Sequence, residues 1–130
     1  MQMLMIDWVG SEEGRIFYHM ADCPDVVEDL YCAVSKSREP MYEIAAKSPA
    51  PISLCGDNVD AVLANPTLFR KYLIPEYEKQ AAVLRRHGKL MAVHMDGRVR
   101  VLTDMIGQTP IDSQPVLPLD PAAIERIGRR

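Results

Sequence analysis

The most constraining feature of this sequence is a long helical pattern that runs directly into a short apolar segment with a polar end. Residues 66–87 carry apolar side chains at helical spacing, and Gly88 follows as a helix stop. Leu90–Val93 is then a short apolar run, typical of a strand buried on both faces of a parallel sheet. His94 and Asp96 come directly after it. Because ligands bind at the carboxyl ends of parallel strands, this unit predicts a polar site at a sheet edge.

The same alternation of strand and helix recurs along the chain. Three further apolar runs predict strands, over residues 2–9, 52–55 and 111–117. Helical spacing predicts helices over residues 24–34, after Pro40, over 99–106 and over 121–127. Pro75 lies inside the long helical pattern and predicts a kink or a split there. Strands that alternate with helices predict an α/β fold of about four parallel strands with right-handed crossovers, in one domain spanning residues 1–130.

Composition excludes several classes of protein. The chain has 130 residues, of which 48% are apolar and 25% charged, so it is neither disordered nor membrane-spanning. The formal net charge is −3, and no basic stripe is available for the phosphates of a nucleic acid. The start of the sequence lacks the basic residues of a signal peptide. Three cysteines without CxxC spacing predict neither a disulfide framework nor an all-cysteine zinc site, and favour a cytoplasmic protein.

His94 and Asp96 are the strongest candidates for a site. An imidazole and a carboxylate two residues apart at a strand end can bind a metal or a polar substrate, and both residue types are zinc ligands. A structural role is the alternative, because a histidine at a strand end often bonds a backbone carbonyl. Asp57 and Asn58 follow the 52–55 strand and would supply a third ligand or bind substrate, although an Asx turn explains the same residues. Gln114, within the last predicted strand, would face the same edge.

Several segments of the chain resemble the uroporphyrinogen decarboxylase superfamily. They are residues 22–30, Gly56-Asp57-Asn58, residues 65–80, Gly88-Lys89 followed by the strand that ends His94-x-Asp96-Gly97, and the Ile111-Asp112 strand start. This superfamily contains the heme-pathway decarboxylases and the zinc-dependent methyltransferases that work with corrinoid proteins. The resemblance implies a TIM-type (β/α) barrel, of which this chain would form a partial barrel of about four strands. It also implies a small-molecule substrate, a possible zinc cofactor and a possible corrinoid-protein partner.

Two departures from the superfamily leave the chemistry open. The methyltransferase branch has His-x-Cys-Gly at this strand end, whereas Asp96 replaces the cysteine here and no later cysteine follows. The decarboxylase branch places its catalytic aspartate and arginines before anything present in this sequence. One hypothesis is therefore an enzyme, a decarboxylase or a methyltransferase, in which His94 and Asp96 are catalytic. The other is a catalytically incomplete partial barrel that binds a ligand or self-associates as a homo-oligomer.

Overall fold

Two helices and two strands form the frame of the computed structural model, which describes residues 15–57, 59–95 and 97–112. The elements in chain order are α1 (Arg15–Asp22), α2 (Pro24–Lys47), β1 (Ile52–Cys55), α3 (Pro66–Leu68), the π-helical η3 (Phe69–Leu73), α4 (Ile74–Arg86), β2 (Leu90–Val93), the 3-10 helix η4 (Arg100–Leu102) and α5 (Thr103–Ile106). The strand predictions over residues 52–55 and Leu90–Val93 are confirmed.

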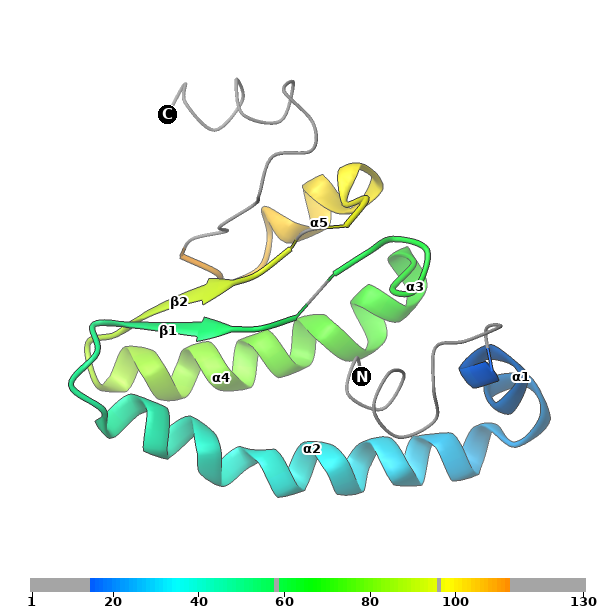
Figure 1. The fold of residues 1–130 in the computed structure, drawn as a ribbon, viewed down its shortest axis with the longest axis horizontal. Helices are drawn as coiled ribbons and strands as arrows, with labels where there is room; N and C mark the ends of the chain where they lie inside the picture. Colours follow the sequence, from blue (N-terminus) through cyan, green and yellow to red (C-terminus); the bar gives the residue numbers. More distant parts are fainter. Residues whose placement is uncertain (1–14, 58, 96, 113–130) are drawn as a thin grey trace.

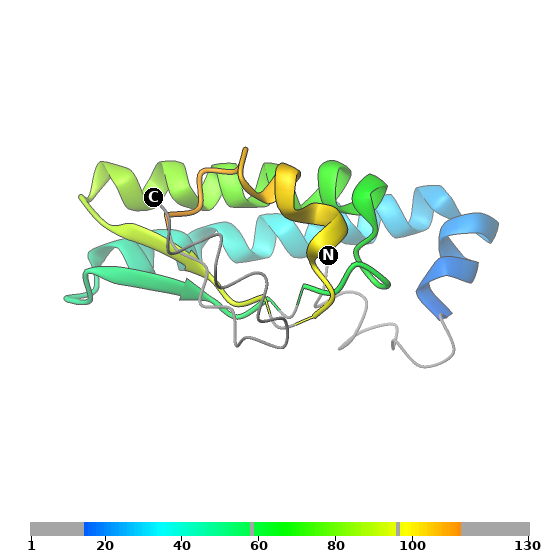
Figure 2. The same cartoon turned by 90° about the horizontal axis from the view of Figure 1, so that it is seen from above.

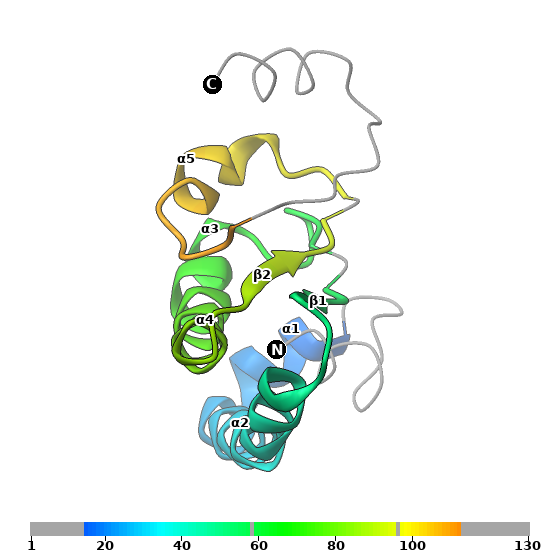
Figure 3. The same ribbon diagram turned by 90° about the vertical axis from the view of Figure 1, so that its left-hand side faces the viewer.

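The two strands pair in parallel, and both large helices cover the same face of the pair. Ile52 is aligned with Leu90, and Cys55 with Val93. In Figure 1, α2 and α4 run side by side in the same direction, opposite to the two arrows. The view in Figure 3 places both helices on one side of β1 and β2. The arrangement is thus one layer of helices against one small sheet.

Helix α2 is longer than the sequence pattern predicted. The pattern predicts two helices, over residues 24–34 and after Pro40, but one continuous helix runs through Pro40 to Lys47. Proline removes one backbone hydrogen bond and does not by itself end a helix when contacts on either side hold it. Here Tyr31, Ser35 and Tyr42 all reach α4, so the helix is held against its neighbour before and after the proline.

The helical segment before β2 follows the sequence signals closely. The Asn65 side chain accepts hydrogen bonds from the N–H groups of Thr67 and Leu68 and caps the segment. The interruption predicted at Pro75 takes the form of the wide turn η3, after which Pro75 stands in the first turn of α4. Gly88 ends the segment with a φ of 67°, a value that favours glycine.

The core lies between α4, α2 and the covered face of the sheet. Tyr77 and Leu84 of α4 are 2% and 0% exposed, and Met91 and Val93 of β2 are both 0% exposed. Figure 2 shows α4 running alongside the two strands and extending beyond them. The alternation of β1 points Ser53 and Cys55 towards this core, and leaves Ile52 and Leu54 on the opposite face.

The predicted partial TIM-type barrel of about four strands is wrong. The described residues are mostly helical and contain two short parallel strands with no barrel. A barrel needs strands that close on themselves with helices all round, whereas here the helices lie on one face only. The predicted strand over residues 2–9 lies outside the described residues. Ile111 and Asp112, at the start of the predicted 111–117 strand, are described and do not form one.

None of the helices formed by the described residues combines the length and the apolar character needed to cross a bilayer.

Candidate functional site

The carboxyl ends of the two parallel strands lie together and define the candidate site. Cys55 and Val93 are paired, and the His94 N–H donates to the Cys55 carbonyl oxygen at 2.9 Å. The pairing therefore continues one residue beyond β2 and holds His94 beside the loop that follows β1. The arrowheads in Figure 1 mark this edge of the sheet. Asp57 and His94, both predicted as site residues, thus follow neighbouring strands at the same edge.

Asp57 is anchored by a buried tyrosine of α4. The Tyr77 hydroxyl donates to Asp57 Oδ2 at 2.9 Å. Burial, and after it the negative charge of Asp57, raises the pKa of Tyr77 far above its usual range, so the phenol keeps its proton and remains a donor. The contact orients a carboxylate that is itself only half-buried. A carboxylate oriented in this way retains acceptor positions for hydrogen-bond donors of a ligand.

Cys55 lies next to the Asp57 carboxylate, and its thiol is unreactive. Burial raises the pKa of its thiol to about 12, and the neighbouring charge of Asp57 adds to the effect. The thiol therefore stays protonated at neutral pH. Since the thiolate is the nucleophile and the metal ligand, Cys55 acts here as a small packing group that donates towards Asp57.

The loops after β1 and β2 are fastened to each other. The Asp60 carboxylate accepts from the Arg98 N–H at 2.9 Å and from the Val62 N–H at 2.7 Å. The backbone hydrogen bond from Arg98 is the main reason that the pKa of Asp60 is lowered. Gly97 lies where the loops touch, and a Cβ there would stand 2.5 Å from the Asp60 Cβ. The site is therefore built on two loops that hold each other.

The structure describes only part of the predicted site. Asp57 and His94 lie at the same sheet edge, but Asn58, Asp96 and Gln114 lie outside the described residues. The roles predicted for His94 and Asp96 as catalytic or metal-binding residues therefore stay predictions, as does substrate binding by Asp57, Asn58 and Gln114. The sequence does not indicate the contact of Tyr77 with Asp57.

The described side chains do not assemble a zinc site of the kind the resemblance implies. Within residues 15–57, 59–95 and 97–112, no three histidine, cysteine, aspartate or glutamate side chains lie close enough together to hold a metal ion. Cys55, whose backbone pairs with His94 at this edge, carries a protonated thiol. A protonated thiol is not a metal ligand.

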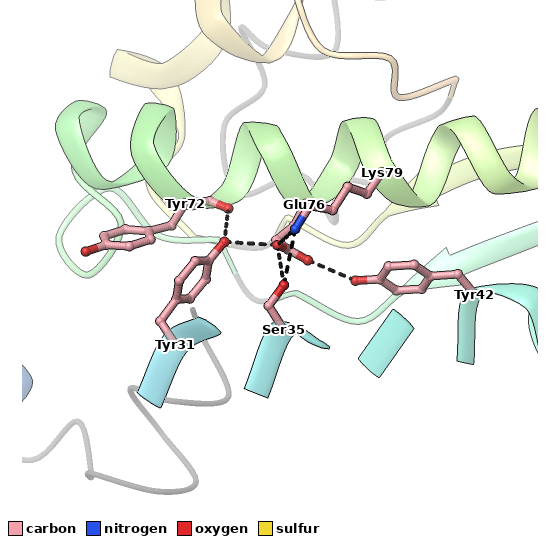
Figure 4. Close-up of polar contacts among 6 residues, drawn as sticks. All are labelled: Tyr31, Ser35, Tyr42, Tyr72, Glu76 and Lys79. Atoms are coloured by element: carbon pink, nitrogen blue, oxygen red, sulfur yellow. Dashed lines mark hydrogen bonds and ion pairs between the residues drawn. The ribbon is translucent and has the colours of Figure 1, made fainter. Parts of the chain in front are cut away.

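A second polar cluster lies between α2 and α4, and sequence reasoning missed it. Glu76 accepts hydrogen bonds from the Tyr31 hydroxyl at 3.0 Å, the Ser35 hydroxyl at 2.6 Å, the Tyr42 hydroxyl at 3.1 Å and the Lys79 ammonium at 2.9 Å. Figure 4 shows these side chains converging on the carboxylate from both helices. Tyr31, Ser35 and Tyr42 recur at nearly helical spacing on one face of α2, and this is the signal that would have found them.

The Glu76 cluster stabilises the contact between α2 and α4 and is not a candidate binding site. Burial alone would raise the pKa of Glu76, but the hydrogen bonds from Ser35, Lys79 and Tyr31 together lower it. Burial and the Glu76 charge raise the pKa values of Tyr31 and Tyr42 well above the usual range. The acid therefore stays charged and the phenols stay protonated, with every donor already directed at the carboxylate. A saturated network of this kind joins two helices and offers nothing to a ligand.

Comparisons with known proteins add no relative: no family model matches the chain, and neither the curated proteins nor the solved structures contain a significant match.

Proposed function

We propose that the carboxyl ends of β1 and β2 bind a small polar molecule that carries hydrogen-bond donors, such as an amine or a hydroxyl group. The observation that carries this proposal is the contact between Tyr77 and Asp57. A buried phenol orients a half-buried carboxylate at the strand ends, 2.9 Å away. Among sheets with parallel strands, this is the position where ligands bind.

A comparison of Asp57 with Glu76, which also accepts from tyrosines, illustrates why Asp57 is the better acceptor for a ligand. Glu76 receives three hydroxyl groups and one ammonium group from its own chain. Asp57 receives one hydroxyl group, from Tyr77, and a weak donor, the Cys55 thiol. A donor from outside therefore gains more at Asp57 than at Glu76.

His94 gives the proposed site its second polar group. Its backbone is fixed by the hydrogen bond to the Cys55 carbonyl oxygen, and its side chain is partly exposed. An imidazole donates or accepts according to its tautomer, so it complements the acceptor-only carboxylate of Asp57. Decarboxylation and methyl transfer, the reactions that the resemblance implies, would both begin with binding at this edge.

Amide chemical shifts of the ¹⁵N-labelled chain, titrated with methylammonium and separately with acetate, test the proposal. Methylammonium carries only donors and acetate only acceptors. We expect methylammonium to shift the amides of Gly56, Asp57 and His94, and acetate to leave them unchanged. Asp57→Asn removes the charge at the site, and should abolish the methylammonium response.

Asp104→Asn is the matched control, because it removes one exposed carboxylate from α5 and leaves the strand ends untouched. It should respond to methylammonium as the natural sequence does. Shifts that persist in Asp57→Asn, or that spread over acidic residues throughout the chain, would refute binding at the strand ends.

A further inference from the structure

The outer edge of β1 has no neighbouring strand among the described residues. The pair consists of β1 and β2 alone. The carbonyl groups of Pro51 and Cys55 point towards β2, where they accept from Leu90 and His94. Backbone groups alternate along a strand, so those of Ile52 and Leu54 point to the outer edge. An isolated pair of strands is only marginally stable, and a further strand on this edge would stabilise it.

Although β1 is short, it carries none of the residues that usually block further pairing at an exposed edge. Exposed edge strands usually carry a charge, a proline or a bulge that blocks further pairing. The sequence of β1 is Ile-Ser-Leu-Cys, with none of these. On the face away from the helices, Ile52 is 50% exposed, Leu54 61% and Leu90 49%, whereas Ala92 is buried. The edge therefore adjoins exposed apolar side chains.

The outer edge of β2, by contrast, is already occupied. The Asp112 N–H donates to the Met91 carbonyl oxygen, and the Met91 N–H donates to Asp112 Oδ2, both at 2.9 Å. Arg85 holds this segment in place through the Pro110 carbonyl oxygen at 2.9 Å. Since Met91 faces away from β1, these bonds take the Met91 backbone groups that another strand would use at this point of the edge. Pairing through β1 therefore ends with two copies and does not propagate.

We propose that two copies of this chain pair antiparallel through the outer edges of their β1 strands, about a two-fold axis at Ser53. This register places Ile52 opposite Leu54 of the second copy, and Leu54 opposite Ile52 of the second copy. Both outward-facing residues of each strand are then hydrogen-bonded. The Ile52 and Leu54 side chains of the two copies join into one stripe on the face away from the helices.

The charges at the two ends of β1 favour the same antiparallel arrangement. Lys89 precedes β2, and its ammonium binds the carbonyl oxygens of Ser48 and Ala50, just before β1 begins. Lys47, exposed at the end of α2, is close in sequence to the same point. Asp57 follows the end of the strand. An antiparallel pair brings the basic start of each strand to the acidic end of the other, whereas a parallel pair would place like ends together.

Sedimentation of the full chain tests the pairing, together with a double variant at the interface. We expect a dimer for the natural sequence. Ile52→Lys with Leu54→Lys would place two pairs of like charges directly opposite each other, and should weaken association about tenfold or more. Leu90→Lys with Val101→Lys adds the same charge at residues 49% and 67% exposed. This control should remain dimeric, because neither residue lies at the interface.

Disulfide trapping tests the register without placing a charge in the strand. In a background with the three native cysteines replaced by serine, Ser53→Cys should form a covalent dimer on mild oxidation. Opposed residues of this kind bring their Cα atoms to about 4.5 Å, within disulfide range. Leu54→Cys should not cross-link, although Leu54 is 61% exposed, because its two copies are offset along the strands.

Three results would overturn the proposal. A natural chain that stays monomeric up to high concentration excludes the pairing. Equal dissociation of the Leu90→Lys, Val101→Lys control shows that the copies meet through the apolar faces and not through the edges. Cross-linking of Leu54→Cys as readily as Ser53→Cys excludes the register about Ser53. If the double lysine variant does not fold, cross-linking of Ser53→Cys and Leu54→Cys alone tests the pairing and its register.

Discussion

The two sides of this molecule differ in how completely their groups are satisfied. Where α2 meets α4, Glu76 receives four donors and the surrounding apolar side chains are buried. On the far side of the sheet, Ile52, Leu54 and Leu90 are about half exposed or more, and the edge of β1 has no neighbouring strand among the described residues. The helix side is closed and stabilises the fold. The strand ends and the outer edge are where contacts with other molecules remain to be made.

The largest expected difference between these two sides concerns their leucines. Leu84→Ala, at a residue 0% exposed on the helix side, should lower the free energy of unfolding by about 2–5 kcal/mol because it leaves a cavity. Leu54→Ala, at a residue 61% exposed on the sheet, should change it by about 0.5 kcal/mol at a concentration where the chain is monomeric. Urea denaturation followed by circular dichroism measures both. Equal losses would mean that Leu54 is covered in solution.

The Glu76 cluster should be the most sensitive polar part of the helix side. Glu76→Ala leaves the Ser35, Tyr31 and Tyr42 hydroxyls without their shared acceptor, and should cost about 2–3 kcal/mol. Glu28→Ala is the control, because Glu28 also contacts a lysine and a tyrosine but is 42% exposed on its side chain. An exposed pair of this kind should contribute about 1 kcal/mol or less. Similar losses for both variants would contradict a special role of the buried cluster.

The loss of stability at acid pH also reports how much the Glu76 cluster contributes to the helix side. The pKa of Glu76 is lowered from 4.5 in the folded state, so its contribution is fully present above that pH and is lost as the pH falls through the folded pKa. Glu76→Gln should therefore flatten the decline in stability below about pH 4.5. Melting temperatures measured between neutral pH and pH 3 report the slope. An unchanged slope in Glu76→Gln would mean that other carboxylates dominate acid unfolding.

Gly97 tests how tightly the two loops of the strand ends hold each other. In Gly97→Ala the new Cβ would stand 2.5 Å from the Asp60 Cβ and 2.6 Å from the Val59 carbonyl oxygen, so the loops must separate. A loss of about 1–3 kcal/mol is expected. Gly107→Ala serves as control, because its Cβ would meet nothing closer than 3.5 Å. Thermal unfolding of both variants gives the comparison, and equal stability of the two would show that the loops are free to move apart.

The smallest expected effect is kinetic and concerns the cysteines. Cys55, with a pKa raised to about 12, should react with a thiol reagent at pH 8 far more slowly than the exposed Cys32. Mass spectrometry of partially labelled chain identifies which cysteine has reacted. Because the raised pKa stabilises the folded state below the unfolded value of 9.0, stability should fall as the pH rises above it. Rapid labelling of Cys55 at pH 8 would show that the strand ends open.

Local sequence signals predicted the elements that depend on neighbours in the chain. Asn65 caps the helical segment as its side chain indicated, Gly88 ends it, and the two short apolar runs form β1 and β2. Each of these depends on residues within a few positions, where capping, backbone preference and apolar alternation act directly. The polar residues at the strand ends were found for the same reason, since Asp57 and His94 directly follow those runs.

The parts that were missed depend on residues far apart in the chain. Glu76 lies 34 to 45 residues from the α2 hydroxyls that it binds, so its cluster exists only because the two helices meet. Those contacts also carry α2 through Pro40, where a local reading ended the helix. The number of strands in the sheet was predicted wrongly, because an apolar run indicates a buried strand but not how many other strands pair with it. Sequence alone determined where β1, β2 and the helical segment between Asn65 and Gly88 begin and end, through short-range backbone and capping preferences. Tertiary structure decided which faces close, because burial and hydrogen bonding between distant elements depend on how those elements meet.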